Sequence, residues 1–128
     1  MDNGIPPAVL QFLEHHITSI EQLEVLLLLR EHAGRAWTAE EVSRHLRSSV
    51  MSIQGRLNDL ASRRLLAVEP VESGEGYVYS PGGDEIARII DGLAKAYKER
   101  RLTIINHIYG RPPNELRSFA DAFLLKKK

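Results

Sequence analysis

The chain has 128 residues, which is enough for one domain with a real core and too few for a second large one. A hydrophobic fraction of 43% and a charged fraction of 27% are ordinary for a soluble globular protein, and the absence of cysteine excludes a disulfide framework and a thiolate metal site. No signal peptide is recognisable, and the longest apolar run, Val25 to Leu29, is too short to span a bilayer, so a cytoplasmic protein is expected.

The net charge of zero hides a division along the chain. Residues 95–128 hold nine Lys or Arg against three acids, whereas residues 1–94 hold eight basic and fourteen acidic residues. A nucleic-acid-binding protein usually carries a clear basic face. The overall balance therefore does not by itself favour a nucleic-acid partner.

Two helices are predicted in the first part of the chain. Pro6 and Pro7 precede an apolar-rich stretch over residues 8–17, and Ser19 to Gln22 has the spacing of a capping box. In the helix that follows, six of the seven residues from Leu23 to Leu29 are apolar and leave almost no polar face. Such a helix is buried on most sides, so it is expected at the centre of the core, with Gly34 at its end.

Residues 38–79 predict a helix, a tight turn, a second helix and a β-hairpin. A second capping-box pattern at Thr38 to Glu41 opens a short helix, and Ser48 or Ser49 caps a longer one that ends near Arg64. Strands are expected over residues 65–71 and 75–79, joined at residues 73–76. The helical spacing predicts that the second helix turns these residues inward: Val50, Ile53, Leu57, Leu60 and Ala61.

One long helix is predicted over residues 84–109. It carries an apolar stripe at helical spacing, formed by Ile86, Ile90, Leu93, Tyr97, Ile104 and Ile108. A final helix is expected over residues 114–125. This organisation corresponds to a winged-helix part with N-terminal helices over 1–83 and a C-terminal helix with a basic tail over 84–128, within one compact domain.

The helix-turn-helix region resembles that of bacterial winged-helix regulators of the MarR and PadR type. The resemblance rests on Val42 to Leu46, Ser49 to Ile53, the leucines Leu57 and Leu60, and the closing tetrad Arg63 to Leu66. It implies a mainly α fold with a small β-hairpin, a winged helix-turn-helix. It also implies a homodimeric transcriptional regulator whose second helix enters the major groove of double-stranded DNA. The long helix after the wing resembles the dimerisation helix of those regulators.

The sequence departs from that pattern in two places. The turn position that is usually glycine is Arg47, and the hairpin carries Glu69, Glu72 and Glu75 where a basic residue is usual. Acidic side chains repel phosphate, which argues against insertion of this wing into a groove.

The candidate DNA-contacting residues lie on the leading half of the second helix. Serine, glutamine and arginine side chains contact base edges or phosphates. The predicted DNA-contacting set is Ser48, Ser49, Ser52, Gln54 and Arg56. The predicted dimerisation set is the apolar stripe of the long helix, because it exceeds what a small winged domain can cover alone.

Other classes of function find less support in the sequence. The histidines do not form a metal-ligand set, no catalytic constellation is recognisable, and no cofactor is expected. Trp37 is expected to pack against the helix that follows it. The alternative that stays open is a protein–protein interaction module that keeps the winged-helix fold without binding DNA. The acidic wing and the zero net charge favour this alternative.

Overall fold

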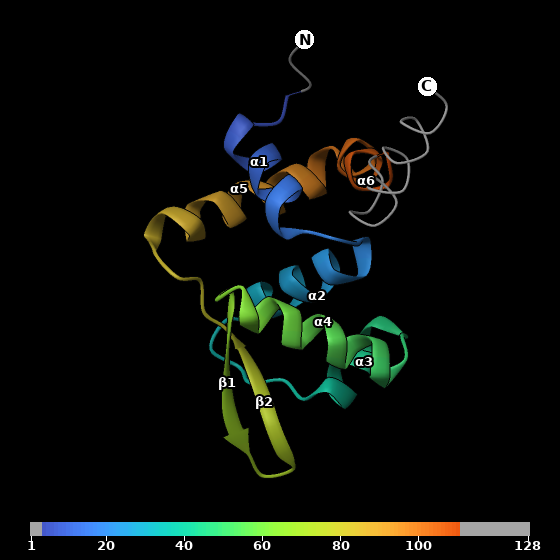
Figure 1. Cartoon of the computed structure of the whole chain (residues 1–128), viewed down its shortest axis with the longest axis vertical. Helices are drawn as coiled ribbons and strands as arrows, with labels where there is room; N and C mark the ends of the chain where they lie inside the picture. Colours follow the sequence, from blue (N-terminus) through green and yellow to red (C-terminus); the bar gives the residue numbers. More distant parts are fainter. Residues whose placement is uncertain (1–3, 111–128) are drawn as a thin grey trace, which may run out of the picture.

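The computed structural model describes residues 4–110, which form six helices and one two-stranded antiparallel sheet (Figure 1). In chain order the elements are α1 (Pro7–His16), α2 (Ile20–Glu31), α3 (Ala39–Leu46), α4 (Val50–Ser62), β1 (Leu66–Val71), β2 (Gly74–Tyr79), α5 (Asp84–Glu99) and α6 (Arg101–Tyr109). This is the predicted winged helix-turn-helix order, with α3 and α4 as the helix-turn-helix and β1–β2 as the wing.

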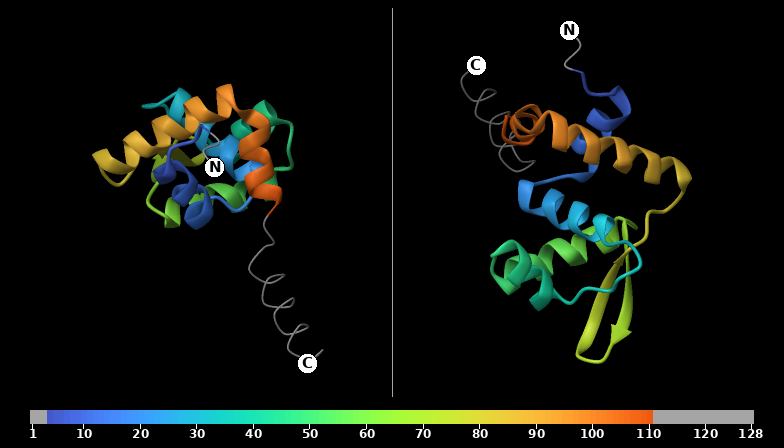
Figure 2. Two further views of the ribbon diagram at one scale, coloured as in Figure 1. Left: turned by 90° about the horizontal axis from the view of Figure 1, so that it is seen from above. Right: turned by 180° about the vertical axis from the view of Figure 1, so that it is seen from behind.

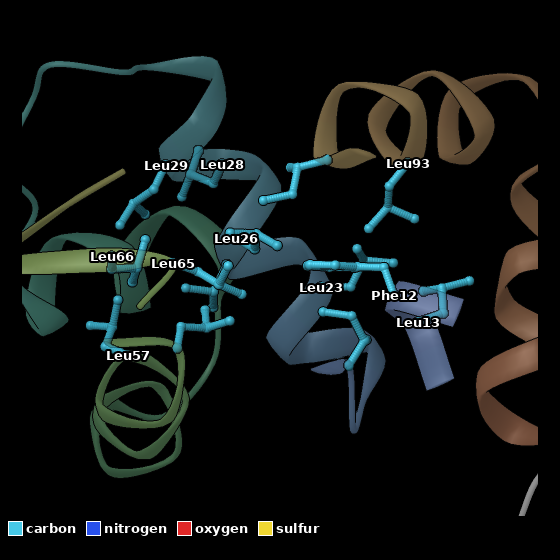
Figure 3. Packing of buried hydrophobic residues seen from close by; sticks show 14 of the residues in the cluster. Phe12, Leu13, Leu23, Leu26, Leu28, Leu29, Leu57, Leu65, Leu66 and Leu93 are labelled. Atoms are coloured by element: carbon cyan, nitrogen blue, oxygen red, sulfur yellow. The ribbon is translucent and has the colours of Figure 1, made fainter. Parts of the chain in front are cut away.

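Helix α2 lies between two layers of the molecule (Figures 1 and 2). On one side α1, α5 and α6 pack together, and on the other side α4 and β2 pack against α2. The close-up of the core shows leucines of α2 between Phe12, Leu13 and Leu93 on one side and Leu57, Leu65 and Leu66 on the other (Figure 3). The expected position of this apolar helix at the centre of the core is confirmed.

Side-chain caps begin three of the helices where the sequence predicts them. The hydroxyl of Ser19 accepts a hydrogen bond from the backbone N–H of Gln22 at 3.0 Å. Thr38 and Glu41 form a complete capping box at the start of α3. Ser49, rather than Ser48, caps α4. These bonds satisfy N–H groups that the first turn of a helix leaves without partners.

The hairpin pairs Leu66 with Tyr79 and Val71 with Gly74, so its turn consists of Glu72 and Ser73. The turn was predicted two residues later. Gly74 has a φ of 135°, a conformation that only glycine adopts easily. Strand β2 therefore begins at Gly74, one residue earlier than predicted. An additional bridge joins Trp37 to Tyr77, so the segment before α3 pairs with the wing.

The inner face of α4 follows the predicted helical spacing except at its first residue. Ile53, Leu57 and Leu60 are fully buried, whereas Val50 is 42% exposed and Ala61 is half-buried. Val50 lies on the opening turn, at the edge of the buried face. The prediction that it turns inward was wrong.

The predicted helix over residues 84–109 is divided in two. Helix α5 is the long helix after the wing, but it ends at Glu99, and Arg100 has φ −135° and ψ 53° before α6 begins. The chain changes direction at this point (Figure 2). The break has a physical reason, because α1 contacts both α5 and α6, and a straight helix would carry Ile104 and Ile108 away from that layer.

Helix α1 packs on α5 and α6 although it is far from them in sequence. Helix α1 therefore lies in the same layer as the helices after residue 83, and the division of the chain at that residue stays a prediction. In the part of the chain described here, no helix is long and apolar enough to cross a membrane. The helix predicted over residues 114–125 lies outside the described residues.

The burial of α4 generates a stability prediction with a matched control. Leu57→Ala is expected to lower the free energy of unfolding by about 2–5 kcal/mol, because it leaves a cavity between α4 and α2. Val50→Ala, on the exposed edge of the same helix, should change it by less than about 0.5 kcal/mol. Urea unfolding followed by circular dichroism measures both, and equal effects would contradict the observed orientation of α4.

Candidate nucleic-acid interface

The outermost face of α4 is formed by Met51, Gly55 and Asn58, all of which are exposed. They lie opposite the buried Ile53 and Leu57, as the helical repeat requires. A side chain built at Gly55 would meet nothing within 4 Å. At Gly55 this face is therefore free of other parts of the described chain and can approach a partner closely.

One flank of α4 is joined to the wing by Tyr77. The buried Tyr77 hydroxyl accepts a hydrogen bond from Gln54 Nε2 at 2.7 Å and donates one to Asn58 Oδ1 at 2.7 Å. Gln54 also donates to Asn58 at 3.2 Å. The three polar groups thus fix the wing against α4, and Gln54 is half-buried rather than fully presented to solvent.

The opposite flank of α4 faces Glu21, in the first turn of α2. The Ser52 hydroxyl donates to Glu21 Oε1, and Arg56 Nε lies 2.9 Å from the same oxygen in an ion pair. The sequence predicts that both side chains contact DNA. The structure places them on the side of α4 that faces the body of the protein, because α2 crosses there and supplies a carboxylate.

The environment of Glu21 stabilises its ionised form. Partial burial raises the pKa of this carboxyl, but hydrogen bonds from Ser52, Arg56 and Ser48, with the charge of Arg56, outweigh burial, and the net pKa is lowered from 4.5. The stabilisation is therefore fully present above pH 4.5 and is lost as the pH falls through the lowered value.

A second polar network holds the trailing half of α4. The fully buried Gln22 donates from Nε2 to Asp59 Oδ2 at 2.5 Å and accepts from the backbone N–H of Thr18 at 2.6 Å. Asp59 also pairs with Arg63 at 2.9 Å, and Arg63 donates to the carbonyl of His15. Because the network spans the α1–α2 connection and α4, it resists rotation of α4 about its own axis.

The turn before α4 contains a residue that the sequence-based set did not include. Arg47 is exposed, caps α3 and has a φ of 58°, in the left-handed region that costs a non-glycine residue energy. Arg44, in the last turn of α3, is also exposed. Within residues 4–110 neither arginine forms an ion pair with an acidic side chain. The signal in the sequence was the arginine at a position where the resemblance predicts glycine.

The wing carries three exposed acidic residues, Glu69, Glu72 and Glu75. In the described region none of them is paired with a basic side chain. The hairpin also projects away from the helices at the end of the molecule opposite α6 (Figure 1). The unneutralised negative charge of the hairpin would therefore attract a cationic partner and repel an anionic one at this end of the molecule.

The five predicted DNA-contacting residues thus fall into different environments. Ser49 caps α4, Ser52 and Arg56 bind Glu21, and Gln54 binds Tyr77. Ser48 is half-buried, and a hydrogen bond links its side chain to Glu21. The contact of these five residues with DNA stays a prediction.

The predicted dimerisation stripe is largely used inside the protomer. Ile90, Leu93, Ile104 and Ile108 are buried in the core, and Ile86 and Tyr97 are half-buried against it. The premise that a small winged domain could not cover this stripe was wrong, because α1 and α2 pack against it. Dimerisation itself stays a prediction.

Other candidate sites are limited. Within the described residues, no group of three or more His, Cys, Asp or Glu side chains could hold a metal ion. Trp37 is buried, contacts His45 of α3 edge to face, and has the Arg35 guanidinium 3.7 Å above its ring. Its expected packing against α3 is confirmed. A shallow cavity of about 750 Å³ between α2 and α5 is lined mainly by charged side chains, including Arg30 and Asp91.

The Glu21 contacts generate a prediction about stability and pH. Glu21→Gln is expected to lower the free energy of unfolding by about 1 kcal/mol at pH 7, because a charge-assisted pair at a partly solvated site is replaced by neutral hydrogen bonds. The difference from the parent protein should shrink as the pH falls below 4.5, since the parent carboxylate then becomes protonated. Urea unfolding at pH 7 and below pH 4.5 measures it. Glu14→Gln, at an exposed position of α1, is the control and should change the free energy of unfolding at pH 7 by less than about 0.5 kcal/mol.

Comparison with known proteins establishes the fold. No family model and no curated protein sequence matches the chain. Solved structures do match it. They include a variant of S. aureus MepR bound to an oligodeoxyribonucleotide (TM-score 0.56, 16% identity, 93% of this chain and 83% of that chain). Bacillus subtilis YusO matches with a TM-score of 0.55, 19% identity and coverage of 94% and 81%. Bordetella bronchiseptica BpsR, whose DNA binding is described as regulated by 6-hydroxynicotinic acid, matches with a TM-score of 0.53, 20% identity and the same coverage. The chain therefore has the winged helix-turn-helix fold of MarR-type regulators, as the motif between Val42 and Leu66 predicts.

Proposed function

We propose that the protein is a DNA-binding transcriptional regulator that acts as a homodimer, with α4 as its recognition helix. The observation that carries the proposal is the open outer face of α4, where Met51, Gly55 and Asn58 are exposed and no other described side chain covers Gly55. In helix-turn-helix proteins the corresponding face lies in the major groove. The binding of DNA by a protein of the same fold supports the same partner here. Such a regulator would act in the cytoplasm.

Two arginines next to this face provide the phosphate contacts that the proposal requires. Arg44 and Arg47 are exposed at the leading end of α4 and are not held by carboxylates of the described chain. Contacts to phosphate supply most of the affinity for DNA and fix the register of a recognition helix. Arg56 is a weaker candidate for this role, because Glu21 already neutralises it.

We propose that the two copies of the homodimer contact each other through α6. Leu102 and Tyr109 are 74% and 75% exposed on the layer away from the wing. A second copy related by a two-fold axis would cover them and place two recognition helices at half-sites about one helical turn of DNA apart. In this arrangement the buried stripe supports α6 from inside, and the exposed side chains of α6 meet the partner.

The dimer has a direct test. The parent protein is expected to show about twice the chain mass of 14.4 kDa in light scattering at micromolar concentration. Leu102→Asp should shift the mass toward the monomer, because a charge would then be buried at the contact. Met51→Asp, at an exposed position near the opposite end of the molecule, is the control and should leave the mass unchanged. A parent particle of 14.4 kDa would contradict the homodimer.

DNA binding has a test in which stability and affinity change in opposite directions. Arg47→Gly relieves the left-handed backbone conformation and should stabilise the fold by about 0.5–1 kcal/mol. It also removes a phosphate contact, so affinity for mixed-sequence duplex DNA should fall several-fold. The slope of log Kd against log salt should decrease by about one for each protomer bound. Fluorescence anisotropy over a salt series measures both quantities.

Arg64→Gly is the matched control. Arg64 is also exposed and has a φ of 64°, but it lies at the trailing end of α4. The same gain in stability is expected without the loss of affinity.

If the parent protein does not bind duplex DNA even at low salt, the proposal fails, and the alternative of a protein–protein interaction module would be preferred. The three unpaired glutamates of the wing would then suit a basic protein partner.

A further inference from the structure

The leading end of α4 exposes two large apolar side chains where a DNA-facing surface is usually polar. Met51 is 86% exposed, more than any other large apolar side chain within residues 4–110, and its neighbour Val50 is 42% exposed. Neither residue contributes to the core that holds α4, which rests on Ile53, Leu57 and Leu60. The fold therefore gives no structural reason for a large apolar group at position 51.

The position of Met51 on the helix determines what it can reach. It lies two residues before the buried Ile53, hence on the opposite side of α4, and Gly55 follows one turn later on the same face. Because Gly55 has no side chain and nothing lies above it, Met51 projects beyond the helix surface next to it. In a helix that enters a groove with its N-terminal residues first, a side chain at the position of Met51 would reach the base edges.

The chemistry of the Met51 side chain limits which of the four bases it can recognise. Its thioether is at best a weak hydrogen-bond acceptor and cannot donate a hydrogen bond to the N7 or O6 acceptors of a purine. In the major groove thymine alone among the four bases presents a methyl group. A flexible and polarisable methionine packs well on such a group.

We propose that Met51 is a specificity-determining residue that selects thymine through its 5-methyl group. The inference rests on the proposed function, because it requires α4 to lie in the major groove. Val50 borders the same contact and extends the apolar surface. Arg44 and Arg47 flank it with positive charge and would hold the neighbouring phosphates.

The experiment replaces thymine by deoxyuridine, which lacks the methyl group and keeps every hydrogen bond and charge. A preferred duplex is first selected from a random pool with the parent protein, and each thymine in it is then exchanged in turn. At one thymine per half-site the exchange should weaken binding by the parent protein about fourfold, the effect of withdrawing one methyl group from an apolar contact. Binding by Met51→Ala should not respond to that exchange, and its salt dependence should equal that of the parent protein.

Two variants control for general effects. Met51→Leu keeps an apolar side chain of similar size and should keep the response to deoxyuridine. Val68→Ala removes an exposed apolar side chain from the wing and should also keep it. If duplex DNA binds but no exchange matters, or if Met51→Ala responds as the parent protein does, the inference is overturned and the proposed function stands. Failure of every duplex to bind at low salt would overturn both.

Discussion

The burial of α2 on both sides is the constraint on which the rest of the structure depends. Leu23, Leu26 and Leu29 are fully buried, and each contributes about 1.5–3 kcal/mol relative to an exposed side chain. One side of the helix holds α1 and α5, and the other holds α4 and the wing (Figure 3). Because both layers pack on the same helix, α2 sets the position of α4 relative to the layer of α1, α5 and α6.

The N-terminal turn of α2 adds a second, polar constraint. Glu21 holds Ser52 and Arg56, and the adjacent Gln22 holds Asp59, so two consecutive residues bind α4 over two of its turns. Apolar packing alone would tolerate a small rotation of α4, since contacts between leucines have little directionality. Hydrogen bonds and an ion pair are directional. They decide which narrow strip of α4 remains outward.

Charge is distributed unequally around that strip. The last turn of α3 and the turn before α4 present Arg44 and Arg47 without carboxylate partners in the described chain, whereas the wing presents unpaired glutamates. A polyanion would be attracted to the leading end of α4 and repelled by the hairpin. The proposed mode of binding therefore relies on the helix, and the hairpin has a structural role through Tyr77, which ties it to Gln54.

The sequence alone determined the features that depend on neighbouring residues. The caps at Ser19 and Thr38, a cap at Ser48 or Ser49, the hairpin and the burial of α2 follow from local hydrogen bonding and helical periodicity. Only the tertiary structure decided the break at Arg100 and the pairing of Arg56 with Glu21. These depend on which elements meet across long separations in the chain, and no local pattern records that. For this reason the sequence alone predicted the helix α4, whereas the side chains that α2 binds on one flank of it depend on the tertiary structure.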